Sequence, residues 1–234
     1  MDKNNGIWAS PNNREPEITN KNKKLNGKIK IYDTTLRDGE QTIGVAFNRY
    51  EKLEIAQLLE EIGVERIEAG MPIISKEDFK AVELILNNVK KSEIWGFCRC
   101  TREDIDACLE AGVKYVICEI PLSEYKHKAY GFQREEVLEC LVKHVHYAKS
   151  QGLYTAFFGV DSTRADLEYM KEAYVRAVKE GGADEVVIVD TLGVACPEAV
   201  SYLTQELRSW VDVPIMVHCH NDLGMATACT LAAL

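Results

Sequence analysis

The sequence lacks the long apolar runs of a membrane protein and has little positive charge. No stretch of its 234 residues approaches the roughly 18 consecutive apolar residues that span a bilayer, and its N-terminus has no apolar signal-peptide core. The formal net charge is −9, whereas general nucleic-acid binding needs clustered positive charge to displace counterions. We therefore expect neither a membrane nor a nucleic acid as a partner.

Several short functional motifs are missing as well. Neither GxGxxG nor GxxxxGK[ST] occurs, which argues against a glycine-rich phosphate loop. There is no CxxC, and the eight cysteines show no regular framework. Most lie in apolar runs, where a free thiol behaves as a small hydrophobic side chain. This usage predicts reduced cysteines and a cytoplasmic location.

What the chain does contain is a repeated unit. Segments 60–70, 109–120 and 179–190 each run from a helix-like stretch through glycine into an apolar, β-branched run, and 150–159 is a looser copy. Glycine suits a helix C-terminus because it adopts positive φ without a Cβ clash. Continuous apolar runs are typical of strands covered on both faces, as in a parallel sheet. We place strands near 29–34, 65–69, 94–98, 114–120, 153–159, 185–190 and 213–218.

Helical patterns separate these strands. Ser75 with Asp78 and Thr101 with Asp104 resemble capping boxes, and Pro197 suits the first turn of another helix. Alternation of strands and helices predicts βα units, in either a (β/α)₈ TIM barrel or an open doubly wound sheet. We favour the α/β TIM barrel because polar residues follow many strand ends. They are Asp33 to Asp38, Glu68, Arg99, Glu119, Asp161, Asp190 and His218 to His220.

The expected barrel is incomplete. Residues 1–27, rich in Asn and Lys, are interpreted as a mobile N-terminal tail, and residues 28–234 as the barrel. This stretch holds about seven βα units, whereas a barrel typically needs eight units and about 250 residues. The eighth strand and helix are missing, so we expect a homo-oligomer or a second chain that supplies this unit.

Two polar clusters at strand ends suggest chemistry. His218 and His220 are two residues apart, so in a strand their imidazoles face the same side, where an aspartate from another strand would complete a divalent-metal site. The alternative is a pair of buried histidines bonded to the backbone. Asp222 could orient one imidazole or cap the next helix. Arg37 and Asp38, near the first strand end, form either a surface ion pair or a site where arginine stabilises enolate charge.

Two of these segments carry a family resemblance. DTTLRDGEQ at 33–41 and HCHNDLGMATA at 218–228 resemble motifs of the acyl-CoA condensing enzymes, the 2-isopropylmalate, homocitrate and citramalate synthases. Four shorter segments follow the family's order: IEAGMP (67–72), GFCR (96–99), DSTRADLEYM (161–170) and DTLGVACPEA (190–199). The resemblance runs from about residue 28 to the last residue.

The resemblance implies a metal-dependent Claisen condensation of acetyl-CoA with a 2-oxo acid, followed by thioester hydrolysis. Asp38, His218 and His220 would hold the divalent ion, which is Mg²⁺, Mn²⁺ or Zn²⁺. Arg37 would be catalytic and also bind substrate. The other implied substrate-binding residues are Gln41, Glu68, Arg99 and Thr191. For Glu68 and Arg99, ion pairing within the barrel is an equally good interpretation.

The sequence also departs from the family. Val160 stands where the family usually has a glutamate, and Ala156 where homocitrate synthases of the lysine pathway carry an arginine. An asparagine metal ligand expected after the eighth strand is absent. These departures leave two alternatives open: a carbon–carbon lyase or aldolase on the same scaffold, and an inactive fragment or non-catalytic subunit of a split synthase.

Overall fold

The computed structural model describes Pro16 and residues 29–234. Ile31–Leu234 form one compact unit, which holds every strand discussed below. The tail expected over residues 1–27 lies outside the described residues, apart from Pro16. Among the described residues, no helix has the length and apolar character needed to cross a bilayer.

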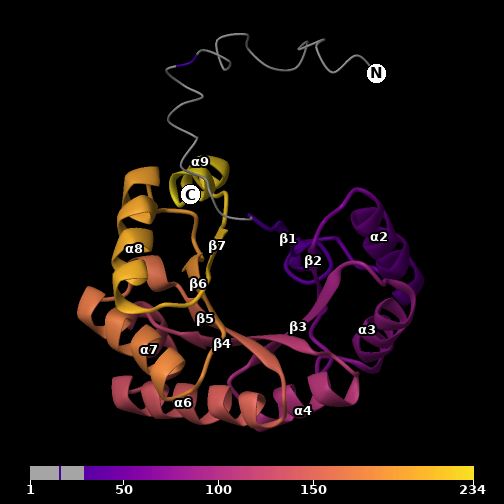
Figure 1. Ribbon diagram of the computed structural model, residues 1–234, viewed down its shortest axis with the longest axis horizontal. Coiled ribbons are helices and arrows are strands. Elements are labelled where there is room, and N and C mark those ends of the chain that lie inside the picture. Colours follow the sequence, from indigo (N-terminus) through magenta and orange to yellow (C-terminus); the bar gives the residue numbers. More distant parts are fainter. Residues whose placement is uncertain (1–15, 17–28) are drawn as a thin grey trace. The chain divides into compact units, whose positions relative to one another are not determined.

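Seven parallel strands form a single sheet whose spatial order follows the chain (Figure 1). They are β1 (Tyr32–Asp33), β2 (Arg66–Gly70), β3 (Glu93–Arg99), β4 (Tyr115–Pro121), β5 (Tyr154–Val160), β6 (Glu185–Asp190) and β7 (Ile215–Cys219). All seven predicted strands are confirmed, and six agree with their expected bounds to within two residues. The first is shorter than expected, because residues 29–31 do not join the strand.

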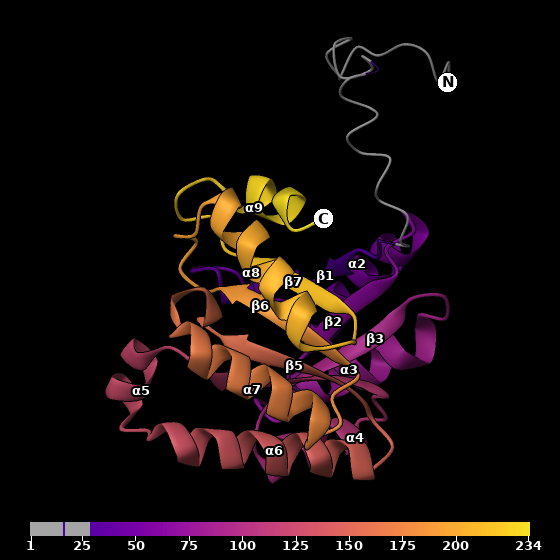
Figure 2. The ribbon, with the colours of Figure 1, turned by 60° about the vertical axis from the view of Figure 1, so that its left-hand side comes forward.

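Helices connect successive strands and cover the outer face of the curved sheet, as Figures 1 and 2 show. They are α2 (Arg49–Glu61), α3 (Lys76–Asn88), α4 (Arg102–Glu110), α5 (Glu124–Tyr130), α6 (Arg134–Ser150), α7 (Leu167–Lys179), α8 (Pro197–Trp210) and α9 (Ala226–Ala232). Two short 3₁₀ turns, η3 (Gly39–Gln41) and η4 (Ser162–Arg164), lie in loops that follow strands. Pro197 opens α8 as predicted.

The two expected capping boxes are only half formed. The Ser75 and Thr101 hydroxyls accept the backbone N–H of Asp78 and Asp104, as expected for N-caps. The return bond to the N-cap backbone is replaced by other contacts. Asp78 accepts from Lys52 Nζ at 2.8 Å, and Asp104 accepts from Arg99. These carboxylates therefore tie neighbouring elements together.

Both faces of strands β2 to β6 are largely buried, which explains their continuous apolar runs. Outward side chains pack against the helices in one large core. Inward side chains form a second cluster in which Trp95 is central: its ring lies 5.4 Å from Tyr32, 5.4 Å from Tyr115 and 5.8 Å from Tyr154. A filled interior of this kind is typical of a TIM barrel rather than of an open doubly wound sheet.

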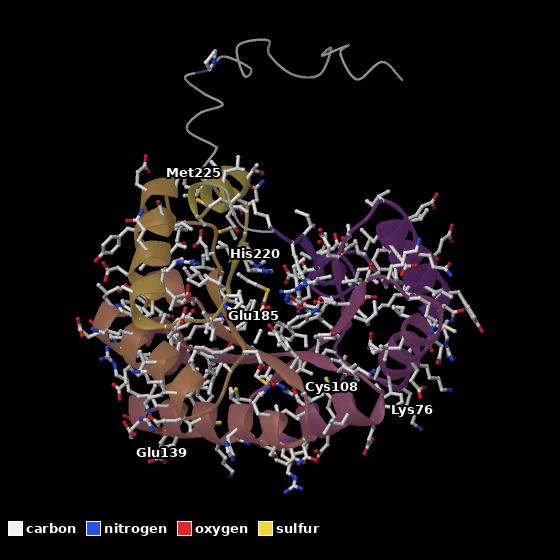
Figure 3. The ribbon with its side chains drawn as sticks, viewed as in Figure 1. Lys76, Cys108, Glu139, Glu185, His220 and Met225 are labelled. Atoms are coloured by element: carbon white, nitrogen blue, oxygen red, sulfur yellow. The ribbon has the colours of Figure 1, made fainter. Side chains whose placement is uncertain are left out.

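An ion pair across the interior also requires a strongly curved sheet. Arg66 on β2 donates from both terminal nitrogens to Glu185 on β6, each at 2.7 Å. These strands are not neighbours, so the sheet must curl until the two side chains meet. Figure 3 shows Glu185 within the ring of strands and Glu139 on the outside. The predicted incomplete barrel is confirmed, with β1 and β7 as the two edges of the sheet.

Candidate functional site

The loop after β1 folds back over the end of its own strand. The backbone N–H groups of Arg37, Asp38 and Gly39 all donate to the carbonyl oxygen of Thr34, at 3.2, 2.9 and 3.0 Å. Leu36 is completely buried and fixes the loop to the core. This turn brings the Arg37 and Asp38 side chains to the carboxyl end of the sheet.

Glu40 in the same loop has a structural role. Its carboxylate lies 2.6 Å from Lys52 Nζ and accepts the backbone N–H of Phe47 at 2.9 Å. Lys52 is almost fully buried and also pairs with Asp78. Glu40 thus links the loop to α2 and α3.

Asp38, His218 and His220 converge on one point. Asp38 Oδ2 lies 3.6 Å from Nε2 of each histidine, and the two Nε2 atoms lie 3.3 Å apart. Both imidazoles therefore point to the same side, as their spacing predicts. The phenyl ring of Phe158 packs edge-on against His218, with 5.3 Å between ring centroids. Figure 3 shows His220 on the inner side of the strands.

This donor set fits a divalent metal ion. A carboxylate oxygen and two imidazole nitrogens are common ligands, with bonds of about 2.0–2.2 Å, so ligand atoms around one ion lie roughly 3.0–3.6 Å apart. The three measured separations fall in this range. Among the described residues, these three form the one group of histidine, cysteine and carboxylate side chains with such mutual proximity.

Arg37 lies beside this group in a fixed orientation. Its Nε donates to Glu68, its Nη1 donates to Asp38 at 3.0 Å, and its guanidinium lies 4.0 Å above the ring of Phe97. Glu68 is itself held by the Tyr32 hydroxyl, which donates at 2.7 Å. Arg37 Nη2 is buried and has no partner among the described residues. One N–H face of the guanidinium is therefore available to a ligand.

The surroundings of Asp38 and Arg37 favour the charged form of each side chain. The neighbouring imidazole of His218 lowers the pKa of Asp38 to about 2, and Arg37 and His220 add to an effect that outweighs partial burial. Burial alone would lower the pKa of Arg37, but Glu68 and Asp38 reverse the sign and raise it. The Asp38 carboxyl is thus ionised at neutral pH.

The cluster opens into a pocket of about 300 Å³ at the carboxyl ends of the strands. This is the end at which TIM-barrel active sites are built. The pocket is lined by Tyr32, Thr34, Asp38, Glu68, Ile117, Phe158, Val187, Met216, Val217, His218, Cys219, His220 and Thr230.

The structure brings Arg37, Asp38, Glu68, His218 and His220 together, as expected, but three other candidates lie apart. The Arg99 guanidinium turns to Asp104 and makes two bonds to it, at 2.8 and 2.9 Å. Gln41 is exposed in η3. The Thr191 hydroxyl accepts the backbone N–H of Asp161 at 2.8 Å.

Two aspartates noted in the sequence follow strands β5 and β7. Asp161, one of the strand-end polar residues, is fully buried and bonded to Ser123 and Arg164. Asp222 does not cap α9; instead the side chain of Asn221 accepts the Ala226 N–H at 3.1 Å.

Sequence reasoning missed the groups that position Arg37. Tyr32 holds Glu68, and Phe97 lies under the guanidinium. The alternation of side chains along a strand could have identified both residues, because every second residue faces the same side. Tyr32 lies two residues before Thr34 on the inward face, and Phe97 lies two residues after the inward Trp95. Glu119, which was noted only as a strand-end residue, lies on the same inward face of β4 as Ile117.

The comparisons with known proteins agree with this geometry. Homocitrate synthase AksA of Methanothermobacter thermautotrophicus is 43% identical over 229 residues, which is 97% of this chain and 57% of the relative. The 2-isopropylmalate synthase of Methanocaldococcus jannaschii is 40% identical over 225 residues, 94% of this chain and 43% of the relative. The chain thus spans about half the length of these relatives.

A solved structure shares the fold. The HMG-CoA lyase of Bacillus subtilis superposes with a TM-score of 0.77 at 21% identity, covering 88% of this chain and 73% of the lyase. A model of the HMGL-like family matches residues 28–234, nearly all of the chain. This chain belongs to the HMGL-like family.

Proposed function

We propose that residues 28–234 form the catalytic barrel of an acyltransferase that condenses acetyl-CoA with a 2-oxo acid to give a 2-hydroxy dicarboxylic or tricarboxylic acid. The observation that carries the proposal is the meeting of Asp38, His218 and His220 beside the unpaired Nη2 of Arg37. The names of the relatives, homocitrate synthase and 2-isopropylmalate synthase, support it. A cytoplasmic location is part of the same proposal.

Asp38, His218 and His220 would hold Mg²⁺, Mn²⁺ or Zn²⁺. A bound divalent ion supplies Lewis acidity toward the oxygens of a 2-oxo acid. Arg37 donates from Nη2 to a substrate oxygen and balances negative charge that develops there. Its orientation needs no adjustment, because Glu68 and Phe97 already fix the guanidinium plane.

The remaining candidates have smaller parts in the proposal. The Thr191 oxygen accepts from the Asp161 backbone, which leaves its own O–H free to donate to a substrate carboxylate. Both Glu68 oxygens are already engaged, by Arg37 and Tyr32, so Glu68 positions Arg37. Gln41 and Arg99 reach a substrate only after their side chains turn inward.

A further strand would pair with the edges of the sheet. β1 and β7 end the sheet on either side of the site, and unpaired edges are prone to association. We propose that a further βα unit fills this position, supplied by a longer form of the chain, by a second polypeptide, or by a homo-oligomer. Size measurement by light scattering, with and without a candidate second chain, distinguishes these sources.

The test of the function is release of CoA from acetyl-CoA with Mg²⁺ or Mn²⁺, using pyruvate, 2-oxoisovalerate, oxaloacetate and 2-oxoglutarate in turn. We expect release that requires both a metal ion and one of the oxo acids, and that stops when a chelator is added. Cleavage of a hydroxyacyl-CoA without any condensation would support a lyase instead. Neither reaction from a folded, metal-binding chain would support the non-catalytic subunit.

A further inference from the structure

Glu119 stands at the mouth of the barrel on the strand opposite the metal-ligand loop. It is in register with Phe158 on β5 and with Arg99 on β3, and residues in register on parallel strands share one face of the sheet. Phe158 lines the pocket and packs against His218. The Glu119 carboxylate therefore belongs to the inner wall beside the site.

This carboxylate is poorly compensated. No described side chain donates a hydrogen bond to it, while its backbone oxygen accepts from Cys100 N at 3.0 Å. Burial raises the pKa of Glu119 even though Arg37 and Arg99 act in the opposite direction. Ionisation of Glu119 is therefore costly, and a second carboxylate beside it would raise that cost further.

The two arginines near Glu119 are bonded to other carboxylates. Arg37 is bonded to Glu68 and Asp38, and Arg99 makes two bonds to Asp104. Lys126 on α5, the remaining cation near Glu119, lies 5.9 Å from the centroid of the Tyr130 ring. Among the described residues, Lys126 makes no ion pair with a carboxylate, and Arg37 keeps one nitrogen, Nη2, without a partner.

The rest of the wall is apolar. Ile117, Phe158 and Val187 line the pocket from three successive strands. They offer an aliphatic surface to the part of a substrate that extends beyond the metal-binding oxygens.

We propose that this site selects a 2-oxo acid with a short, uncharged aliphatic tail, and that Glu119 excludes a second carboxylate. The proposal deepens the proposed function and rests on it for the oxo-acid class. Its physical basis is the repulsion of like charges in a partly buried site, where the interaction is screened less than in water. The apolar wall adds favourable burial for a hydrocarbon tail and none for a carboxylate.

The test compares two ligands of nearly the same shape. Oxaloacetate and 4-methyl-2-oxopentanoate differ at the tail, where a carboxylate replaces an isopropyl group. Calorimetric titration of each into the Mn²⁺-loaded full chain gives their dissociation constants. We expect the uncharged ligand to bind at least about tenfold more tightly, the ratio produced by a modest like-charge penalty.

The variant Glu119→Gln keeps the shape of the side chain and removes its charge. We expect it to shrink the affinity ratio about tenfold, mainly by improving oxaloacetate binding. Glu124→Gln is the matched control, because Glu124 is exposed and pairs with Arg134 on the surface, and it should leave the ratio unchanged. A purely structural role of Glu119 would weaken both ligands equally.

Three outcomes overturn the proposal: tighter or equal binding of oxaloacetate, an unchanged ratio in Glu119→Gln, or no binding of either ligand to the Mn²⁺-loaded chain. These readouts are equilibrium affinities. Selective binding of the uncharged oxo acid without CoA release would reject the condensing activity and keep the specificity. CoA release with oxaloacetate as the preferred substrate would keep the condensing activity and reject the specificity.

Discussion

At the scale of single residues, the site depends on a few side chains whose positions are fixed by close contacts. The ligand atoms of the three candidate metal ligands lie within 3.6 Å of one another. Arg37 is held by the carboxylates of Glu68 and Asp38 and by the ring of Phe97. Removing one ligand should therefore be felt in binding far more than in folding.

His218→Ala should lower Mn²⁺ affinity by more than about 100-fold, since even partners that only orient a ligand cost 10–100-fold when lost. The free energy of unfolding of the metal-free chain should change by about 1 kcal/mol or less, because His218 is only partly buried. Calorimetric titration and urea unfolding measure the two effects. The control is His146→Ala, at an exposed position on α6. Unchanged Mn²⁺ binding in His218→Ala would reject the assignment.

At the scale of elements, the loop after β6 supports the turn after β7. The backbone N–H groups of Gly193 and His220 both donate to the carbonyl oxygen of Asp190, each at 3.1 Å. Gly193 has φ of +59°, and a Cβ there would lie 2.6 Å from Asp222 N and 2.7 Å from His220 O. The two loops can approach this closely only because residue 193 is glycine.

Gly193→Ala should displace the backbone of His220 and lower Mn²⁺ affinity at least about tenfold, as loss of a group that orients a ligand does. Gly152→Ala is the matched control: Gly152 has φ of +82°, but a Cβ there meets nothing within 4 Å. This control should cost about 1 kcal/mol of stability, from the positive φ alone, and leave Mn²⁺ affinity unchanged. Equal Mn²⁺ affinities in both variants would show that the loop contact does not position His220.

At the scale of the whole molecule, the curvature of the open sheet depends on contacts across its interior. Arg66 and Glu185 connect β2 to β6, and the Tyr154 hydroxyl also donates to Glu185 at 2.7 Å. Both charged side chains are almost completely buried. Loss of one partner leaves the other charge uncompensated inside the barrel.

Glu185→Gln should therefore reduce the free energy of unfolding by about 3 kcal/mol or more, as breaking a buried ion pair does. The double variant Arg66→Met with Glu185→Leu should recover part of this loss, because both charges of the interior pair are removed, although Glu93 loses its 2.9 Å contact with Arg66 Nε. Glu135→Gln, which breaks an exposed pair with Arg176, should cost less than about 1 kcal/mol. Urea unfolding compares all three. A similar loss in Glu185→Gln and Glu135→Gln would mean that the interior pair does not stabilise the curved sheet.

Much of the fold was predictable because its signals are local. Apolar runs bounded by glycine mark six strands to within two residues, and Pro197 and Ser75 mark the starts of two helices. The first strand was overestimated because Ile29 and Ile31 read as strand although both are exposed. The paired orientation of His218 and His220 also follows from local spacing, since alternate residues of a strand share a face.

The partners of the charged residues were less predictable. Arg99 was left between substrate binding and ion pairing, and it bonds to Asp104, the first-turn acid of the following helix. Glu68 was left between substrate binding and ion pairing, and its contacts with Arg37 and Tyr32 depend on three elements meeting. A long charged side chain can reach several partners, and a linear pattern does not rank them.

The sequence by itself thus determined the alternation of strands and helices, the parallel order of the strands, and the shared face of the two histidines. These follow from periodicity, glycine placement and apolar runs, which act over a few residues. The meeting of Asp38 with those histidines was expected from the family resemblance and not from local pattern. Only the tertiary structure decided that Arg66 reaches Glu185 and that no described side chain donates a hydrogen bond to Glu119. The reason is curvature: contacts across the interior of a curled sheet join residues far apart in the chain, and local sequence carries no record of which side chains then come together.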